Sequence, residues 1–196
     1  MNKGLILRDE PNSLGRKTKQ MKDSIIVYGS KYGASKRYAE RLSEITGIGC
    51  ISHKKARNIG DYGRVIYIGA LYAGGFVGLK ELVKKLAAGQ ELIVATVGMA
   101  DPADAINSGN IKNALKNIIA EPFYNEKKIF HLRGAIDYKH LKIMHRILLS
   151  MMYSKISKMP ENELDAVSRV ILDTYGKKVD YVDFDTLKPI ADAIGM

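Results

Sequence analysis

The chain of 196 residues is long enough for one compact domain with a sizeable core and too short for two ordinary domains. Hydrophobic residues make up 46% of it and charged residues 27%, which is typical of globular proteins and excludes the disordered and fibrous classes. Its single cysteine, Cys50, excludes an intramolecular disulfide, and no stretch has the length and apolarity of a membrane span, so we expect a cytoplasmic protein.

The formal net charge of +10 raises the question of a nucleic-acid partner. Residues 1–22 hold six Lys or Arg and two acids, and residues 139–158 hold five Lys or Arg and no acid. Almost all of the excess charge therefore lies in one terminal segment and one strongly apolar segment. A nucleic-acid binder usually spreads basic residues over a folded face and interleaves them with aromatic side chains. We therefore expect no nucleic-acid partner.

Apolar strand patterns alternate with helical patterns along the chain. The predicted strands span residues 24–29, 49–52, 64–70, 91–97 and 127–132, and the predicted helices span residues 35–46, 79–88 and 106–120. The pattern of the first helix places Tyr38, Leu42 and Ile45 on one face. Most of the strands are almost continuously apolar, which indicates burial on both faces, and the helices between them favour parallel crossovers. The fold class is therefore α/β, an open parallel sheet with helices on both sides, and ligands are expected at the carboxyl ends of the strands.

The segment VYGSKYGASKRYAERL, residues 27–42, joins the first strand to the first helix through a loop that suits a phosphate. The first amides of a helix lack internal partners and carry positive partial charge. The loop adds hydroxyl groups, and Gly33 lets the backbone approach an anion closely. It lacks the endings of the nucleoside-triphosphate and dinucleotide loops, so a phosphate monoester is predicted. The alternative is that Ser35 only caps the helix and Gly33 only forms the turn.

The spacing Ser-x-x-Gly-x-Ser of this loop resembles the FMN phosphate loop of flavodoxins, Ser/Thr-x-Thr-Gly-x-Thr, with Tyr32 where that family has Thr. Two further loops carry the same resemblance: GALYAGG, residues 69–75, and TVGMADP, residues 96–102. Flavodoxin-like proteins place such loops against the isoalloxazine ring. The resemblance implies a flavodoxin-like fold, with a five-stranded parallel sheet in the order 2-1-3-4-5, and FMN as the cofactor.

The resemblance also implies which residues bind FMN. Tyr72 is expected beside the ring, the backbone of residues 71–75 near the flavin N5 atom, and residues 98–100 on the pyrimidine side. The predicted binding residues are Ser30, Lys31, Tyr32, Gly33, Ala34, Ser35, Leu71, Tyr72, Ala73, Gly74, Gly75, Gly98, Met99 and Ala100. Because the flavin itself carries the electron chemistry, no catalytic residue is assigned. The scattered histidines predict no metal site.

The C-terminal part of the chain resembles a narrower family. HLRGAIDYKHLKIMHRILLSMMYSKISK, residues 131–158, followed by VDYVDFDTLKPIADAI, residues 179–194, is similar to the menaquinone-dependent protoporphyrinogen oxidases of the flavodoxin superfamily. We expect a basic tail at residues 1–22 and one flavodoxin-like domain at residues 23–196, with a basic apolar insertion at about 134–176. The resemblance implies an FMN-dependent oxidoreductase that passes electrons from a reduced substrate to a quinone. The alternative is a flavodoxin-like electron carrier that shuttles between redox partner proteins.

A helical pattern in residues 141–158 has an apolar arc wider than one contact with a sheet needs. One alternative is a helix packed on the sheet on one side and covered by residues 159–176 on the other. The second is that the methionine-rich arc lies on an anionic membrane surface or accepts a quinone, which would place the protein peripherally on the inner face of the membrane. Its basic rim consists of Lys139, Lys142, Arg146, Lys155 and Lys158.

Overall fold

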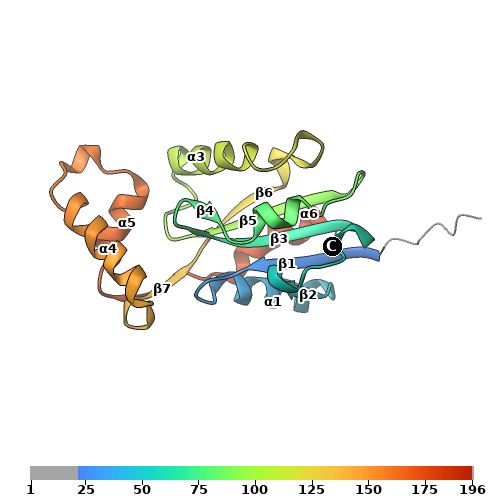
Figure 1. The fold of residues 1–196 in the computed structure, drawn as a ribbon, viewed down its shortest axis with the longest axis horizontal. Helices are drawn as coiled ribbons and strands as arrows, with labels where there is room; N and C mark the ends of the chain where they lie inside the picture. Colours follow the sequence, from blue (N-terminus) through green and yellow to red (C-terminus); the bar gives the residue numbers. More distant parts are fainter. Residues whose placement is uncertain (1–21, 196) are drawn as a thin grey trace, which may run out of the picture.

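A parallel sheet of five strands forms the centre of the structure, a computed structural model that describes residues 22–195 (Figure 1). Its strands are, in spatial order, β2 (Cys50–Ser52), β1 (Lys22–Gly29), β3 (Tyr62–Tyr72), β5 (Glu91–Gly98) and β6 (Ile129–Arg133). The predicted order 2-1-3-4-5 of the parallel strands is therefore confirmed. A further short strand, β4 (Gly75–Phe76), pairs antiparallel with the end of β3. The predicted basic tail, residues 1–22, lies outside the described residues except for Lys22, which begins β1.

Helices cover both faces of the sheet, as predicted. α1 (Ala34–Thr46) and α6 (Lys188–Ile194) pack on one face, and α2 (Leu79–Val83) and α3 (Ala105–Lys116) pack on the other. Successive side chains of β1 point to opposite faces, so Ile25 and Val27 join the core under α2 and α3 while Ile26 joins the core under α1 and α6. This alternation explains why the strands read as continuous apolar runs.

The helix α2 ends at Val83, whereas the sequence pattern predicts a helix to residue 88. The physical reason is the buried side chain of Gln90, which folds the preceding residues into a turn. Its Oε1 atom accepts a hydrogen bond from the Ala87 amide at 2.5 Å, and its Nε2 atom donates to the Ile59 carbonyl at 2.7 Å. The buried amide group of Gln90 is satisfied by these bonds, and they form only if the chain leaves the helix before residue 87.

Two smaller predictions about the helices are also wrong. α3 ends at Lys116 and not at residue 120, because the amides of Ile118 and Ile119 both donate to the Leu115 carbonyl and close the last turn. Ile45 was expected on the buried face of α1, but its side chain is 43% exposed. The buried face is turned toward Tyr38, Ala39 and Leu42 instead, so Ile45 lies at its edge.

A helical hairpin, α4 (Ile143–Ile156) and α5 (Ala166–Thr174), stands apart from the sheet at the left of Figure 1. It is connected to the rest of the chain by an antiparallel ribbon of β7 (Ala135–Asp137) and β8 (Lys178–Asp180). The hairpin has a small core of its own around Ile156, Leu164 and Ile171. The alternative in which α4 packs flat on the sheet is therefore wrong, although α5 does pack against α4.

No helix among the described residues combines the length and the apolarity that crossing a membrane requires.

Candidate functional site

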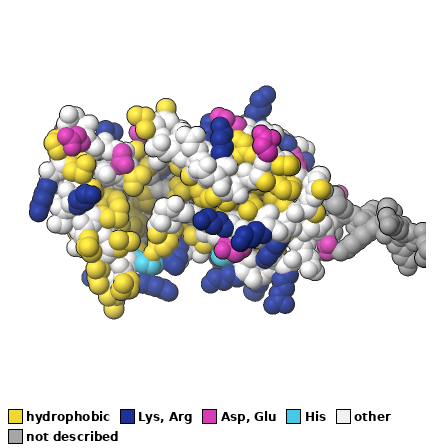
Figure 2. All heavy atoms as spheres, turned by 45° about the horizontal axis from the view of Figure 1, so that its top comes forward, with side chains coloured by type: hydrophobic (Ala, Val, Ile, Leu, Met, Phe, Trp, Pro, Cys, Tyr) yellow, Lys and Arg dark blue, Asp and Glu magenta, His cyan; other side chains and the backbone are white. Residues whose placement is uncertain are grey.

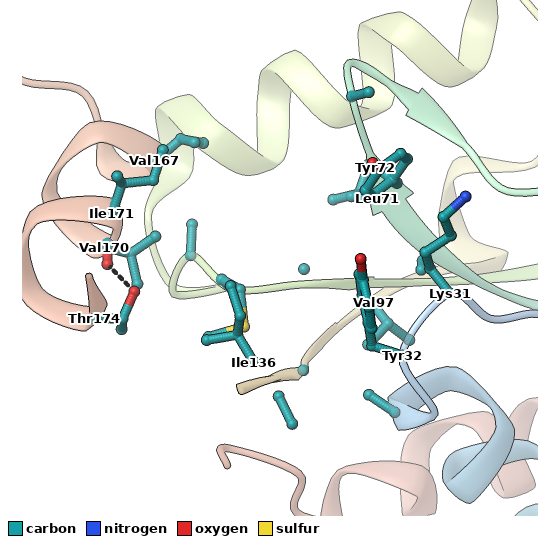
Figure 3. Close-up of a pocket in the computed structure, with 18 of the residues that line it drawn as sticks. Lys31, Tyr32, Leu71, Tyr72, Val97, Ile136, Val167, Val170, Ile171 and Thr174 are labelled. Atoms are coloured by element: carbon teal, nitrogen blue, oxygen red, sulfur yellow. Dashed lines mark hydrogen bonds between the residues drawn. The ribbon is translucent and has the colours of Figure 1, made fainter. Parts of the chain in front are cut away.

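A cavity of about 450 Å³ lies at the carboxyl edge of the sheet, where an α/β fold is expected to bind ligands (Figure 3). The loops after β1, β3 and β5 form one end of it, and α4 and α5 form the other. The structure brings all of the sequence-predicted binding residues to the lining of this cavity except Gly33. We call the part of the cavity lined by residues 30–35, 71–75 and 98–100 its loop end.

The loop after β1 has the geometry of an anion cradle. Gly33 takes a φ of 100°, a conformation that favours glycine, and its amide donates to the Ser30 Oγ atom at 3.0 Å. α1 begins at Ala34 with Gly33 at the N-cap position, so the prediction that Ser35 caps the helix is wrong. The Ser35 side chain is fully buried instead, and its hydroxyl has no hydrogen-bond partner among the described residues. α1 carries no acidic residue in its first turn.

The second loop is a tight hairpin between β3 and β4. Leu71 pairs with Phe76, and Tyr72 pairs with Gly75, so only two residues form the turn. Both have positive φ, 48° at Ala73 and 76° at Gly74, as a two-residue hairpin turn that matches the strand twist requires. The segment GALYAGG therefore is not a free loop, because β3 continues through Tyr72 and projects this side chain over the cavity.

The third loop, residues 98–100, follows β5 and is fixed by its neighbours on β6 and beyond. The Gly98 carbonyl accepts a hydrogen bond from the Gly134 amide at 2.7 Å. The Met99 carbonyl accepts one from the Arg133 guanidinium at 3.3 Å. The backbone on this side of the cavity is thus held in place through two of its carbonyl groups.

His145 is a site residue that sequence reasoning missed. It lies on α4, yet its Nδ1 atom is hydrogen-bonded to the Tyr32 hydroxyl of the loop after β1. Its ring also lies 4.8 Å from the centroid of the Tyr72 ring. Helical spacing could have found it, since the residues of α4 that line the cavity recur every three or four positions and form one face. We call this the inner face of α4: His145, Leu148, Leu149 and Met152.

The charge at the cavity is concentrated at the loop end. Lys31 and His145 are the lining residues with a basic side chain, and no Asp or Glu side chain of the described residues lines the cavity. The Lys31 Nζ atom lies 4.9 Å from the centroid of the Tyr72 ring. Partial burial, followed by the charges of Lys31 and Lys142, lowers the pKa of His145, and partial burial, followed by Tyr32, raises the pKa of Tyr72. Both shifts favour the uncharged form of the side chain.

Comparison with known protein families shows to which family the chain belongs. Residues 25–163, well over half of its length, match the family described as the flavodoxin domain. The chain belongs to the flavodoxin-domain family. It is a flavodoxin-like redox protein, and its cofactor is FMN.

Several solved structures align with part of the chain at low identity. Oxidised Flavodoxin 1 from Bacillus cereus aligns over 57% of this chain and 84% of its own, at 11% identity and a TM-score of 0.40. The Flv1 flavodiiron core from Synechocystis sp. PCC6803 aligns over 58% of this chain and 31% of its own, at 13% identity and a TM-score of 0.41. The rubredoxin oxygen:oxidoreductase from Desulfovibrio gigas aligns over 79% of this chain and 38% of its own, at 11% identity and a TM-score of 0.40. No curated protein sequence matches the chain.

The loop end fits the phosphate of FMN chemically. A buried hydroxyl without a partner is costly, and the Ser35 hydroxyl gains one if it donates to a phosphate oxygen. The amides at the start of α1 carry positive partial charge, and no lining carboxylate of the described residues opposes an anion.

Proposed function

We propose that this flavodoxin-domain protein is an FMN-dependent oxidoreductase resembling menaquinone-dependent protoporphyrinogen oxidase. In each turnover a reduced substrate loses two electrons and two protons, and a quinone takes up two electrons and two protons to become a quinol. FMN, when bound, accepts the electrons and donates them through its ring.

The three loops supply the residues that would hold FMN. The phosphate would be held by the hydroxyls of Ser30 and Ser35 and the first amides of α1, with Gly33 at the N-cap position allowing close approach. The ring would be held by the hairpin at residues 71–75, which includes Tyr72, and by the loop at residues 98–100. Lys31 is the charged side chain beside Tyr72, and the pKa shifts of Tyr72 and His145 favour the uncharged forms of these two groups.

The observation that carries the choice of an enzyme over a carrier is the position of α4 across the cavity. The inner face of α4 lines the cavity, and His145 contacts Tyr32 and Tyr72 at the loop end. A carrier that exchanges electrons with protein partners needs an open flavin edge for docking. A cavity with apolar walls, lined by a helix opposite the three loops, instead favours a small-molecule substrate.

The test first identifies the bound cofactor and then the compound that accepts its electrons. The purified protein should be yellow and should release FMN, and not FAD, on denaturation. After anaerobic reduction, a menaquinone analogue should reoxidise the bound flavin in stopped-flow measurements. Reoxidation by a small redox protein and not by the quinone would favour the electron carrier, and a colourless protein that does not bind FMN at micromolar concentration would exclude both.

We also infer a peripheral contact with an anionic membrane. Ile143, Met144, Ile147 and Met151, the outer face of α4, are 74%, 73%, 49% and 66% exposed. Figure 2 shows hydrophobic side chains gathered over the α4–α5 end of the molecule with Lys and Arg beside them. The basic residues Lys139, Lys142, Arg146, Lys155 and Lys158 are all exposed. Contiguous exposed apolar surface with a basic rim is typical of a helix that lies on anionic lipid.

A further inference from the structure

The cavity extends well beyond the loops that suit FMN. Figure 3 shows Val167, Val170 and Ile171 of α5 facing the loop end across an open space, with Ile136 of β7 between them. The inner face of α4 lines another side. We call this part the helical end of the cavity, lined by Ile136, Leu148, Leu149, Met152, Val167, Val170 and Ile171.

The helical end offers almost nothing to a charged ligand. Its walls are aliphatic side chains and methionine, and the charged Lys31 lies at the loop end. The hydroxyl of Thr174, which also lines the cavity, is used within α5, since it donates to the Val170 carbonyl at 2.6 Å. Moving an unpaired ionic group from water into such walls is costly, whereas an apolar ring gains by the transfer.

The space is a built feature, because the hairpin is held away from the sheet by its own connections. The Tyr138 amide donates to the Lys177 carbonyl at 3.3 Å, and the Tyr181 amide donates to the Gly134 carbonyl at 3.0 Å. An ion pair between Arg37 of α1 and Asp180 of β8 at 2.7 Å fixes the base of the ribbon. Leu148, Met152 and Val167 are partly exposed, so the space opens to solvent. A concave site with apolar walls of this kind suits a small apolar ligand.

We propose that the helical end binds the ring of an uncharged, apolar compound that exchanges electrons with the flavin, and that it excludes anionic compounds of the same shape. This inference rests on the proposed function, which assigns the loop end to FMN. The polar, phosphorylated chain of FMN suits the loop end, and the apolar walls suit the second compound. An anionic electron donor would therefore have to bind with its charged groups outside the helical end.

The test uses two probes and two positions on one helix. The FMN-loaded protein is titrated by calorimetry with 1,4-naphthoquinone and with its 2-sulfonate, which adds one negative charge to the same ring. Met152→Trp fills the helical end with an indole, and Ser154→Trp places the same side chain at an exposed position two residues later. Val167→Trp fills the cavity from α5 and serves if Met152→Trp does not fold. Because the chain has no tryptophan, the fluorescence of each new indole reports its own surroundings.

The neutral quinone should bind the wild type and Ser154→Trp alike, and Met152→Trp about tenfold more weakly or not at all. The sulfonate should bind the wild type about tenfold more weakly than the neutral ring, and FMN content should be the same in all variants. Equal binding to Met152→Trp and Ser154→Trp, equal binding of the two probes, or loss of FMN from Met152→Trp alone would overturn the inference. Binding of the quinone without reoxidation of the flavin would support the helical end as a site while contradicting the proposed acceptor.

Discussion

The hydroxyl of Ser35 illustrates how a single residue connects the fold to the cofactor. It is fully buried and has no partner among the described residues, and it is not the helix cap that its position in the sequence suggests. Folding a hydroxyl into such a place without a partner costs about 1–3 kcal/mol. The nearby Ser30 hydroxyl differs, because it accepts a hydrogen bond from the Gly33 amide and so contributes to the loop without any ligand.

This difference predicts opposite behaviour of two serine variants. Ser35→Ala should leave the free energy of unfolding of the FMN-free protein unchanged or slightly raised, and should weaken FMN binding by about tenfold or more, the effect of one hydrogen bond to a charged group. Ser30→Ala should lower the unfolding free energy of the FMN-free protein by about 1 kcal/mol. Urea unfolding and FMN titration measure both quantities. If Ser35→Ala destabilises the FMN-free protein and leaves FMN affinity intact, Ser35 has only a structural role.

At the scale of single elements, α4 has two functions on opposite sides. Its inner face lines the cavity, with Leu148 and Met152 45% and 38% exposed, and its outer face is more exposed still. The two sets of residues interleave along one helix. This is why its apolar arc in the sequence is wider than one packing contact requires. His145 is the point where the inner face contacts the loop end, through Tyr32 and Tyr72.

The lowered pKa of His145 predicts that this contact depends on pH. The groups that face the imidazole are Tyr32, Tyr72, Lys31 and Lys142, and none of them is an acid that could stabilise its charged form. If the contacts of His145 with Tyr32 and Tyr72 were broken, its pKa would return toward the usual value of about 6.5, so the protein without these contacts binds protons more readily. The contribution of these contacts to the stability of α4 is therefore fully present at higher pH and weakens as the pH falls below about 6.5.

Hydrogen exchange of the α4 amides at about pH 7.5 and about pH 5.5, corrected for intrinsic rates, measures this effect. Protection should fall at the lower pH in the wild type and should not change in His145→Gln, which keeps a polar side chain without a titration in this range. His140→Gln is the matched control. His140 is hydrogen-bonded to Asp137 outside the cavity, so this variant should keep the pH response of the wild type. The same pH response in His145→Gln would show that another group controls α4.

At the scale of the whole molecule, most of the sheet could be predicted from the sequence. Buried parallel strands read as continuous apolar runs, and three loops at neighbouring strand ends carried the resemblance to flavodoxins. The structure places residues of all three loops at one cavity, and their binding of FMN stays a prediction. The short α2 could not be predicted, because Gln90 acts through distant carbonyl groups.

The helical end of the cavity could not be predicted from the sequence, for a similar reason. Val167 and Ile136 are about thirty residues apart in the chain, and they line one cavity because the β7–β8 ribbon positions the hairpin. The role of His145 depends on a contact with Tyr32, more than a hundred residues away. Local patterns describe which face of a helix is apolar, and they do not specify what that face meets.

The outer face of α4 leads to a prediction about the whole molecule and its surroundings. Each Lys or Arg near an anionic surface contributes about 1 kcal/mol, so the five exposed basic residues around α4 are enough for reversible attachment. The protein should co-sediment with vesicles that contain phosphatidylglycerol at low salt, and binding should fall as salt rises because the attraction is screened. Lys142→Glu with Arg146→Glu should abolish binding while FMN stays bound.

The control is the double variant Lys54→Glu with Lys55→Glu, which changes the net charge equally at exposed positions next to β2 and should still bind. Equal loss in both double variants would mean that the net charge of +10, and not the outer face of α4, holds the protein on the membrane. If the wild-type protein does not bind anionic vesicles, the proposed membrane contact is wrong.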